Sequence, residues 1–390
     1  MYDQINFTYG TNFHMNLYCF VLYCFVVLST LRGNISNLYT KERSNGRLIF
    51  IFCGILLFSL TSFVDADFFN YYELMSEYSG NIVDDENVGV ESFYQYLIYF
   101  IGGNYFLFRL AVWGLALIIT VLAARCFQVD VYHTLFIIFA GFIVTFSYAR
   151  ATLAMSVFTM GAIIASMASE CNQKKKYLYT IIGIAILVGS IYLHRSMLPV
   201  IAIAVCVIFL PWKKQFSKYS LWLFPIFIII FSAVMRISFE ELAYIANSWN
   251  EDDTGTLDKM EHYRTMVGVK SNINGYITLA TKYISFYLPF AIIANIFRSS
   301  KVLKLIDKRA TSLYLIVYFI FIIATSFLFM NFDGNTLFYR YLYMSFIPLS
   351  ILIVYMKDCG IMKRTEYLWI VVSMIFSNIL QLFAAVYKEF

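Results

Sequence analysis

Long apolar runs separated by short polar segments recur along the whole chain. A helix that crosses a bilayer needs roughly 20 mostly apolar residues. Twelve runs approach this length, and several of them fall short of it. They cover residues 14–31, 48–64, 104–124, 131–148, 151–169, 177–193, 197–211, 219–235, 276–297, 311–330, 337–356 and 367–386. The pattern predicts an all-α polytopic membrane protein, with a single transmembrane domain over residues 1–390 and about twelve transmembrane helices.

Three segments depart from this pattern. Residues 93–101 are apolar and aromatic but too short to span a bilayer, so we expect them to lie in the membrane interface or to dip into the membrane. The two longest polar loops run from about 65–103 and from about 236–275, and both are acidic. We expect both loops on the same side of the membrane.

The composition explains why lipid must be the solvent of this chain. Hydrophobic residues make up 61% and charged residues 14% of the 390 residues, whereas a soluble domain is about 45–50% apolar and about 25% charged. Aromatic residues reach 19%, and many are expected at the membrane interfaces, where amphipathic rings are favoured.

The distribution of Lys and Arg predicts the orientation. If the N-terminus lies outside, most of the 29 Lys and Arg residues fall in short inner loops or beside them. These are Arg32, Lys41, Arg43, Arg47, Arg125, Lys174, Lys175, Lys176, Lys213, Lys214, Lys218, Arg298, Lys301, Lys304, Lys308, Arg309, Lys357, Lys363 and Arg364. Because short basic loops stay in the cytoplasm, the two long loops are expected outside. The net charge of +5 then reflects orientation, and no nucleic-acid partner is expected.

Familiar catalytic and cofactor motifs are absent from the sequence. There is no CxxC, HExxH, Walker or GxGxxG motif, so neither a cofactor nor a metal site is predicted. No cysteine falls in a long outer loop, and no disulfide framework is expected there.

Arg150 opens the fifth predicted span at its outer end, and two interpretations of it stay open. An Arg at a helix end can simply extend its charge into the interface. Alternatively, the helix N-terminus and the planar guanidinium form a site for phosphate oxygens. The helix that follows carries small residues, which allow close packing in lipid and would hold Arg150 rigidly. They are Ala151, Ala154, Gly161, Ala162, Ala165 and Ser166.

Three further polar residues are expected at the same outer level. His194 and Arg195 lie at the tight junction of spans six and seven, and Arg340 lies in the first turn of span eleven. A His in such a junction commonly bonds a neighbouring carbonyl, and an Arg beside an aromatic belt commonly snorkels. His is also the side chain best suited to proton transfer near neutral pH. Together with Arg150, the group suits a lipid diphosphate bound at the outer leaflet.

The outer loops add further polar candidates. Taken alone, each is most simply a solvated loop charge. They are Asp65, Asp67, Glu91, His262 and Arg264.

Five segments, in order along the chain, resemble those of the EpsG/Wzy-type family of bacterial polysaccharide polymerases. DADFFNYY (65–72) is similar to the family's acidic-aromatic segment, and ESFYQYLIYFIGGNYFLFRL (91–110) to its Glu-initiated segment. SYARATLAMSVF (147–158) resembles its Arg-x-x-x-Ala helix start, YLHRSMLPVIAI (192–203) its His-x-Ser junction, and FYRYLYMSFIPLSIL (338–352) its late Arg-aromatic helix. Each motif is short, so the match depends on their order and spacing. Residues 80–90 and 236–275 do not align.

The resemblance implies a multi-pass glycosyltransferase of the bacterial inner membrane, GT-C-like in architecture, with its active site facing the periplasm. Such enzymes join repeat units of O-antigen, capsule or exopolysaccharide that are carried on undecaprenyl diphosphate. The implied partners are the undecaprenyl-diphosphate-linked oligosaccharide, membrane lipid and, in some systems, a chain-length regulator protein.

This chemistry assigns roles to the candidate residues. Attack of an acceptor hydroxyl on the donor's anomeric carbon expels undecaprenyl diphosphate, so cations should stabilise the leaving group and a base should take the hydroxyl proton. The expected roles are diphosphate binding by Arg150, Arg340, Arg195 and Arg264, proton acceptance by His194 first and Glu91 second, and sugar binding by Asp65 and Asp67.

Three other functions stay open. A transporter or flippase of lipid-linked oligosaccharide would also have about twelve spans, but its charges should lie near mid-membrane and its two halves should be related. An O-antigen ligase, which transfers polymer to the lipid A core, would share the architecture. A membrane acyltransferase would also carry a catalytic His near its acyl donor.

Overall fold

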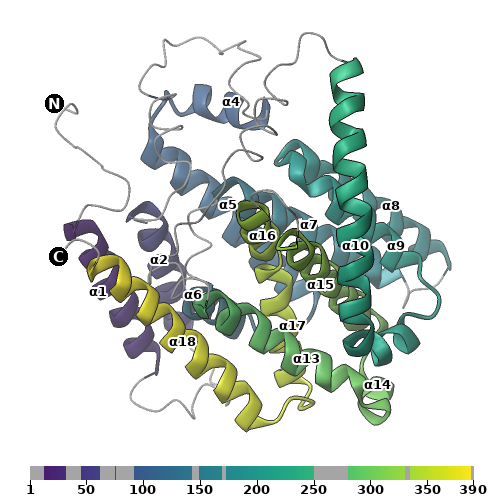
Figure 1. Ribbon diagram of the computed structural model, residues 1–390. Helices are drawn as coiled ribbons and strands as arrows, with labels where there is room; N and C mark the ends of the chain where they lie inside the picture. The colour runs from purple at the N-terminus through teal and green to yellow at the C-terminus, as the bar shows by residue number, and fades with distance from the viewer. Residues whose placement is uncertain are drawn as a thin grey trace.

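The computed structural model describes residues 13–31, 45–61, 75, 92–142, 149–168, 173–249, 280–329 and 334–387. These residues form helices and turns and contain no strand (Figure 1). The helices are α1 (Phe13–Leu31), α2 (Asn45–Thr61), α4 (Ser92–Phe100), α5 (Tyr105–Cys126), α6 (Val131–Gly141), α7 (Ala149–Met167), α8 (Gln173–Gly189), η5 (Ser190–Tyr192), η6 (Arg195–Met197), α9 (Leu198–Phe209), α10 (Lys213–Trp249), η7 (Tyr283–Tyr287), α13 (Leu288–Arg298), α14 (Ser300–Leu305), α15 (Lys308–Phe327), α16 (Gly334–Met344), α17 (Phe346–Asp358) and α18 (Arg364–Tyr387). The predicted all-α class is confirmed.

The lengths of the apolar helices make this a multi-pass membrane protein. In the described ranges, seven helical stretches are long and apolar enough to cross a membrane, or eight if the bent pair α16–α17 counts as one span. Four shorter apolar helices accompany them: Leu17–Leu31, Gly46–Leu60, Val131–Gly141 and Arg195–Phe209.

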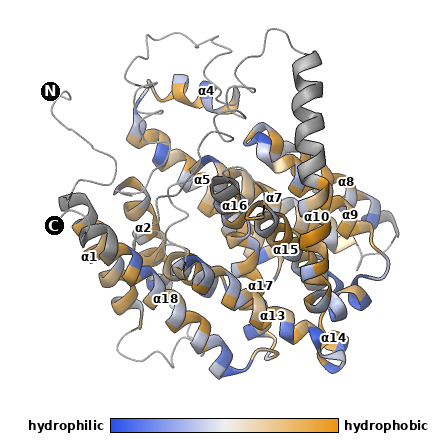
Figure 2. Ribbon diagram, viewed as in Figure 1, coloured by the Kyte–Doolittle hydropathy of each residue, from blue (hydrophilic) through white to orange (hydrophobic). Residues whose placement is uncertain are grey.

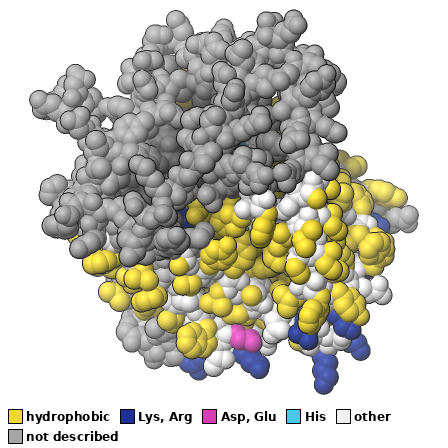
Figure 3. Space-filling view, viewed as in Figure 1, with side chains coloured by type: hydrophobic (Ala, Val, Ile, Leu, Met, Phe, Trp, Pro, Cys, Tyr) yellow, Lys and Arg dark blue, Asp and Glu magenta, His cyan; other side chains and the backbone are white. Residues whose placement is uncertain are grey.

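Apolar side chains cover the outside of the bundle as well as its core. The peripheral helices expose large side chains such as Phe25 (59%), Ile229 (70%) and Trp369 (69%). Hydrophobic residues recur along the helices (Figure 2), and hydrophobic side chains cover much of the coloured surface in Figure 3. In the interior, nearly every residue of α15 and α17 is buried. Water would penalise such a surface, whereas hydrocarbon does not.

Basic side chains gather at one end of the bundle, along the lower edge in Figure 3. Lys214 Nζ donates hydrogen bonds to the carbonyl oxygens of Leu303 (3.0 Å) and Ile306 (2.7 Å), so the start of α10 is tied to the turn between α14 and α15. Arg309 lies over the ring of Phe127, 5.8 Å from its centroid, and joins the start of α15 to the end of α5. We call this the basic end.

A polar clasp at the basic end joins the start of α6 to the end of α17. Asp130 caps α6 by accepting a hydrogen bond from the His133 backbone N–H (3.2 Å), and its own N–H donates to Asp358 Oδ2 (2.9 Å). Asp358 also pairs with Lys357 Nζ at 3.0 Å. Burial alone would raise the pKa of the Asp130 carboxyl, but hydrogen bonds from His133 and the charge of Lys357 outweigh it and lower the pKa from 3.8 to about 2.

Asp130→Ala is expected to lower the free energy of unfolding by about 1 kcal/mol or more, because an N-cap is lost. Since the folded protein has the lower pKa, ionised Asp130 stabilises the fold above about pH 4, and this contribution disappears as the pH falls toward 2. Thermal unfolding in detergent between pH 2 and 6 measures both effects. A variant with the wild-type melting temperature and the same acid sensitivity would contradict the clasp.

Three helix boundaries differ from the sequence-based expectation. Helix α10 continues beyond residue 235 to Trp249, into the range expected to begin an outer loop. Helix α6 ends at Gly141, before the expected residue 148. Span eleven bends by 42° at the junction of α16 and α17, where Pro348 has no N–H to bond the carbonyl of Met344. The short segment predicted at 93–101 is the separate helix α4.

The small residues of α7 bring it very close to α8, as the sequence predicts. A Cβ added to Gly161 would lie 2.8 Å from the backbone nitrogen of Leu187, and one added to Gly183 would overlap Ala165. Backbones therefore touch without side chains between them, which is how small residues stabilise helix pairs in lipid. These contacts hold the second half of α7 against α8.

Candidate functional site

Those candidate residues that the structure describes lie on helices and turns near ends remote from the basic end. They are Arg150, His194, Arg195 and Arg340. Helix α8 starts near Lys175 and ends at η5, and α9 then runs from η6 back toward Lys213. Helix α15 starts at Lys308 in the basic end, so α16 begins at the opposite end. Both η5 and α16 contact α7. Helix α16, which carries Arg340, and η5, which precedes His194, therefore both lie against α7, which begins beside Arg150.

Arg150 is the second residue of α7 and is held by the short helix α4. The buried Tyr94 of α4 donates a hydrogen bond from its hydroxyl to the Arg150 carbonyl oxygen at 3.3 Å. The Arg150 guanidinium carbon lies 5.9 Å from the centroid of the same ring, within cation–π range. Tyr94 in turn packs edge-on against Phe108 of α5. An aromatic side chain thus fixes both the backbone and the charge of Arg150.

His194 and Arg195 lie in a tight turn between η5 and η6. His194 has an extended backbone (φ −164°, ψ 113°), and its N–H donates to the carbonyl oxygens of Ser190 and Ile191, both at 3.1 Å. His194 is half-buried, whereas Arg195 is exposed. Leu193 packs against the apolar cluster that also contains Tyr94 and contacts Ala149. This cluster links the His194 turn to the start of α7.

Arg340 lies on α16 between two packed tyrosines. Tyr341 stacks on Phe327 with ring centroids 5.3 Å apart, and Tyr339 stacks on Tyr343 at 6.2 Å. Arg340 itself is half-buried. Because α16 begins at Gly334, Arg340 lies in its second turn rather than in the first turn that the sequence indicated.

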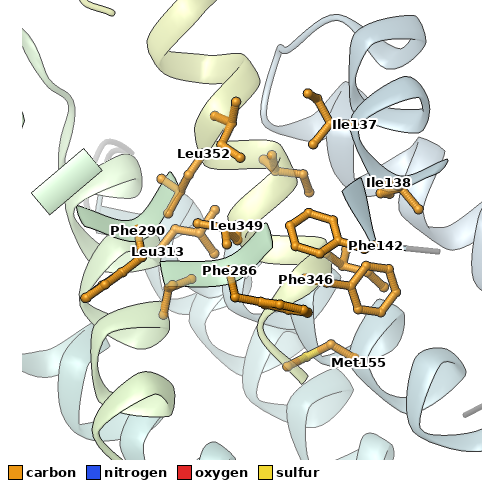
Figure 4. Close-up of a cluster of buried hydrophobic side chains, with 14 of the residues drawn as sticks. Ile137, Ile138, Phe142, Met155, Phe286, Phe290, Leu313, Phe346, Leu349 and Leu352 are labelled. Atoms are coloured by element: carbon orange, nitrogen blue, oxygen red, sulfur yellow. The ribbon is translucent and has the colours of Figure 1, made fainter. Parts of the chain in front are cut away.

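Three irregularities in the helices lie close together in the buried core. The end of α6 at Phe142, the π-helical turn η7 and the bend between α16 and α17 bring together Phe142, Phe286 and Phe346 (Figure 4). Phe142 lies 4.7 Å from Phe286 and 5.9 Å from Phe346, centroid to centroid. Irregular backbone at membrane depth is tolerated only inside protein or along a water-filled cavity, and here aromatic side chains enclose it.

Side chains from distant helices satisfy the broken end of α6. The Asn378 amide donates to the carbonyl oxygens of Ala140 (3.1 Å) and Gly141 (3.0 Å), and the Tyr23 hydroxyl donates to Ala140 (2.7 Å). These bonds replace the intrahelical ones that the next turn would supply. Helix α6 therefore ends inside the bundle without leaving these carbonyls unbonded.

Two buried cations in this half of the bundle were not selected from the sequence as site residues. Arg109 of α5 donates from Nε to the Ser59 carbonyl oxygen (2.6 Å) and from a terminal nitrogen to the Tyr105 hydroxyl (3.2 Å). Lys282 lies just before η7 with its ammonium over the rings of Tyr339 and Tyr343. In both cases the signal in the sequence is a charge inside an apolar run.

The remaining candidates, Asp65, Asp67, Glu91 and Arg264, lie outside the described residues, as does His262. In the part of the chain that is described, no group of three or more His, Cys, Asp or Glu side chains is arranged to hold a metal ion.

The fold defines the class of this protein as a multi-pass, all-helical membrane protein. No protein-family model, no curated protein and no solved structure matches the chain.

Proposed function

We propose that this chain is a polysaccharide polymerase that joins oligosaccharide repeat units carried on undecaprenyl diphosphate, at the periplasmic face of the bacterial inner membrane. The supporting observation is that α16, which carries Arg340, and η5, which precedes His194, both contact α7, whose second residue is Arg150. Two guanidinium groups and an imidazole at one end of a membrane bundle suit a lipid diphosphate. Its phosphates stay at the membrane surface while its polyprenyl chain lies among the lipids.

In the proposed reaction, a hydroxyl of the incoming lipid-linked unit attacks the anomeric carbon of the growing chain. The new C–O bond forms as the bond from that carbon to the diphosphate oxygen breaks, and undecaprenyl diphosphate leaves with both bonding electrons. His194 accepts the hydroxyl proton. Arg150 and Arg340 stabilise the negative charge that develops on the leaving group.

The proposal is tested by incubating the purified protein with a defined undecaprenyl-diphosphate-linked repeat unit. A polymerase makes a ladder of glycans that differ by one repeat unit and releases undecaprenyl diphosphate. Glycans of a single repeat unit and no longer products, whether or not lipid A core is added as an acceptor, would contradict polymerisation. A ligase would be recognised by transfer to the core without elongation.

The proposed topology has twelve crossings, in which the four shorter apolar helices also enter the membrane, and the basic end is cytoplasmic. Single cysteines at positions 85 and 253, in a background without reactive native cysteines, are expected to react with an impermeant reagent added to whole cells. A cysteine at position 175 is expected to react only after permeabilisation. The reverse pattern would invert the orientation and remove the periplasmic site.

One observation favours a flippase as the second candidate. The short helix α6, the π-helical turn η7 and the bend at Ser345 resemble the interrupted helices that transporters use at their binding sites. Reconstituted vesicles with a labelled lipid-linked unit on one leaflet distinguish the two candidates. A flippase moves the label across without making a new glycosidic bond.

A further inference from the structure

Lys282 is a buried lysine whose ammonium lies over two aromatic rings. Its exposed fraction is 4%. Nζ lies 4.2 Å from the centroid of Tyr343 and 5.1 Å from that of Tyr339, on successive turns of the same face of α16. The helical stretch Ala280–Arg298 ends in the basic end, so Lys282, at its start, lies at the opposite end, beside the helix that carries Arg340.

The surroundings of Lys282 lack a negative partner, in contrast to the other buried lysines. Lys357 pairs with Asp358 at 3.0 Å, and Lys213 donates to the Ile208 carbonyl oxygen and to the Ser312 hydroxyl. Among the described residues, neither a carboxylate nor a carbonyl oxygen accepts a hydrogen bond or ion pair from Lys282 Nζ. Aromatic faces attract a cation but do not replace the three acceptors that an ammonium bonds in water. A buried charge of this kind is costly unless an anion joins it.

The backbone around Lys282 is itself irregular. The next five residues, Tyr283–Tyr287, form a π-helical turn. Such a turn inserts an extra residue into the helix and so changes the face on which the preceding residues lie, and it recurs at functional sites. Here the residue that precedes the turn is Lys282. It contacts Tyr339 and Tyr343 of α16, which come before and after Arg340 in the sequence.

We propose that Lys282 is a binding residue for the phosphate groups of a polyprenyl diphosphate, acting with Arg340 across the contact between η7 and α16. The inference rests on the proposed function, because it assigns Lys282 to the same lipid diphosphate. Arg340 supplies a planar fork, and Lys282 supplies a compact charge with three donors. Tyr339 and Tyr343 hold the ammonium in place before the ligand arrives, so little ordering is needed on binding.

The test uses the full-length protein in detergent and undecaprenyl diphosphate without any glycan as the probe. Binding is measured directly, and melting temperature is measured without ligand. Lys282→Met, which keeps the side-chain length but removes the charge, is expected to weaken binding about 10- to 100-fold, the loss of a charge-assisted hydrogen bond. Lys282→Arg is expected to retain most of the binding.

The melting temperatures separate a ligand-binding lysine from a structural one. Without ligand, Lys282→Met is expected to melt at or above the wild-type temperature, because an unpaired buried charge is removed. The matched control is Lys357→Met, a buried lysine 5.8 Å from the ring of Tyr367 that has a carboxylate partner. This control is expected to lower the melting temperature and leave binding unchanged.

Two results would overturn the inference. One is binding by Lys282→Met within twofold of the wild type. The other is a loss of stability like that of Lys357→Met, including failure of both Lys282→Met and Lys282→Gln to fold. The probe carries no sugar, so the binding test is independent of polymerisation. If binding depends on Lys282 but the protein makes no glycan ladder, this inference is supported and the proposed polymerase function is contradicted. If the wild-type protein makes a glycan ladder but Lys282→Met binds the probe normally, the polymerase function is supported and this inference is contradicted.

Discussion

Arg150→Ala and Arg340→Ala are each expected to lower polymer synthesis at least about 100-fold while the protein stays in the membrane. Removing one preorganised donor from a developing anion typically costs about 10²–10³ in turnover. Arg150 is well preorganised, because Tyr94 binds its carbonyl oxygen and its guanidinium carbon lies 5.9 Å from the same ring. Arg340 follows Tyr339 and precedes Tyr341 on α16, both of which stack on other rings, and its side chain is half-buried.

The control variants test whether charge or geometry matters. Arg150→Lys and Arg340→Lys keep the charge but lose the bidentate fork, so they are expected to recover little activity. Arg309→Ala is the matched control, because Arg309 also lies over an aromatic ring, that of Phe127, but at the basic end. It should make nearly normal polymer. The measurement is the glycan ladder, normalised to protein in the membrane. Normal polymer from both site alanine variants would show that these arginines do not bind the diphosphate.

The positions of the helices could be predicted from hydropathy because lipid requires continuous apolar runs whose backbone groups bond within the helix. One helix end was misplaced where side chains from elsewhere replace those bonds. Helix α6 ends at Gly141 because Asn378 and Tyr23 satisfy its last carbonyls, and no local pattern reveals partners so distant in sequence. The bend at Ser345 has a local signal in the sequence, Pro348. Hydropathy alone does not detect the bend, because the apolar run continues through it.

For the site, sequence analysis selected candidate residues at helix ends more readily than residues inside helices. Arg150 lies at the beginning of one apolar run, and His194 lies between two apolar runs. Each is therefore recognisable as a polar residue at a boundary. Lys282 lies near the beginning of the apolar run 276–297. A lysine at that place in a predicted span is easily interpreted as one that snorkels to the membrane interface. Only the packing against α16 reveals that the side chain is buried with its ammonium over the rings of Tyr339 and Tyr343.

The turn that carries His194 restricts this residue to a narrow set of roles. Its backbone is fixed on both sides, because its N–H bonds Ser190 and Ile191 and its carbonyl oxygen accepts from the Met197 N–H at 3.0 Å. The side chain is half-buried and is followed by the exposed Arg195. A neighbouring cation disfavours protonated His and so weakens it as a base. A bound diphosphate would offset this effect by adding negative charge, so under the proposed function we expect His194 to act as a base with the donor bound.

His194→Ala is therefore expected to reduce turnover by about 10²–10⁴-fold, while binding of undecaprenyl diphosphate changes little, because proton transfer contributes only in the transition state. His194→Gln keeps a hydrogen-bonding side chain of similar reach but cannot accept a proton effectively, so it should be as impaired as the alanine variant. A purely structural histidine would give the opposite result, with much of the activity retained by Gln. The test compares glycan ladders and donor binding for both variants at equal protein levels. Near-normal synthesis by His194→Gln would exclude His194 as the base and leave Glu91 as the next residue to test.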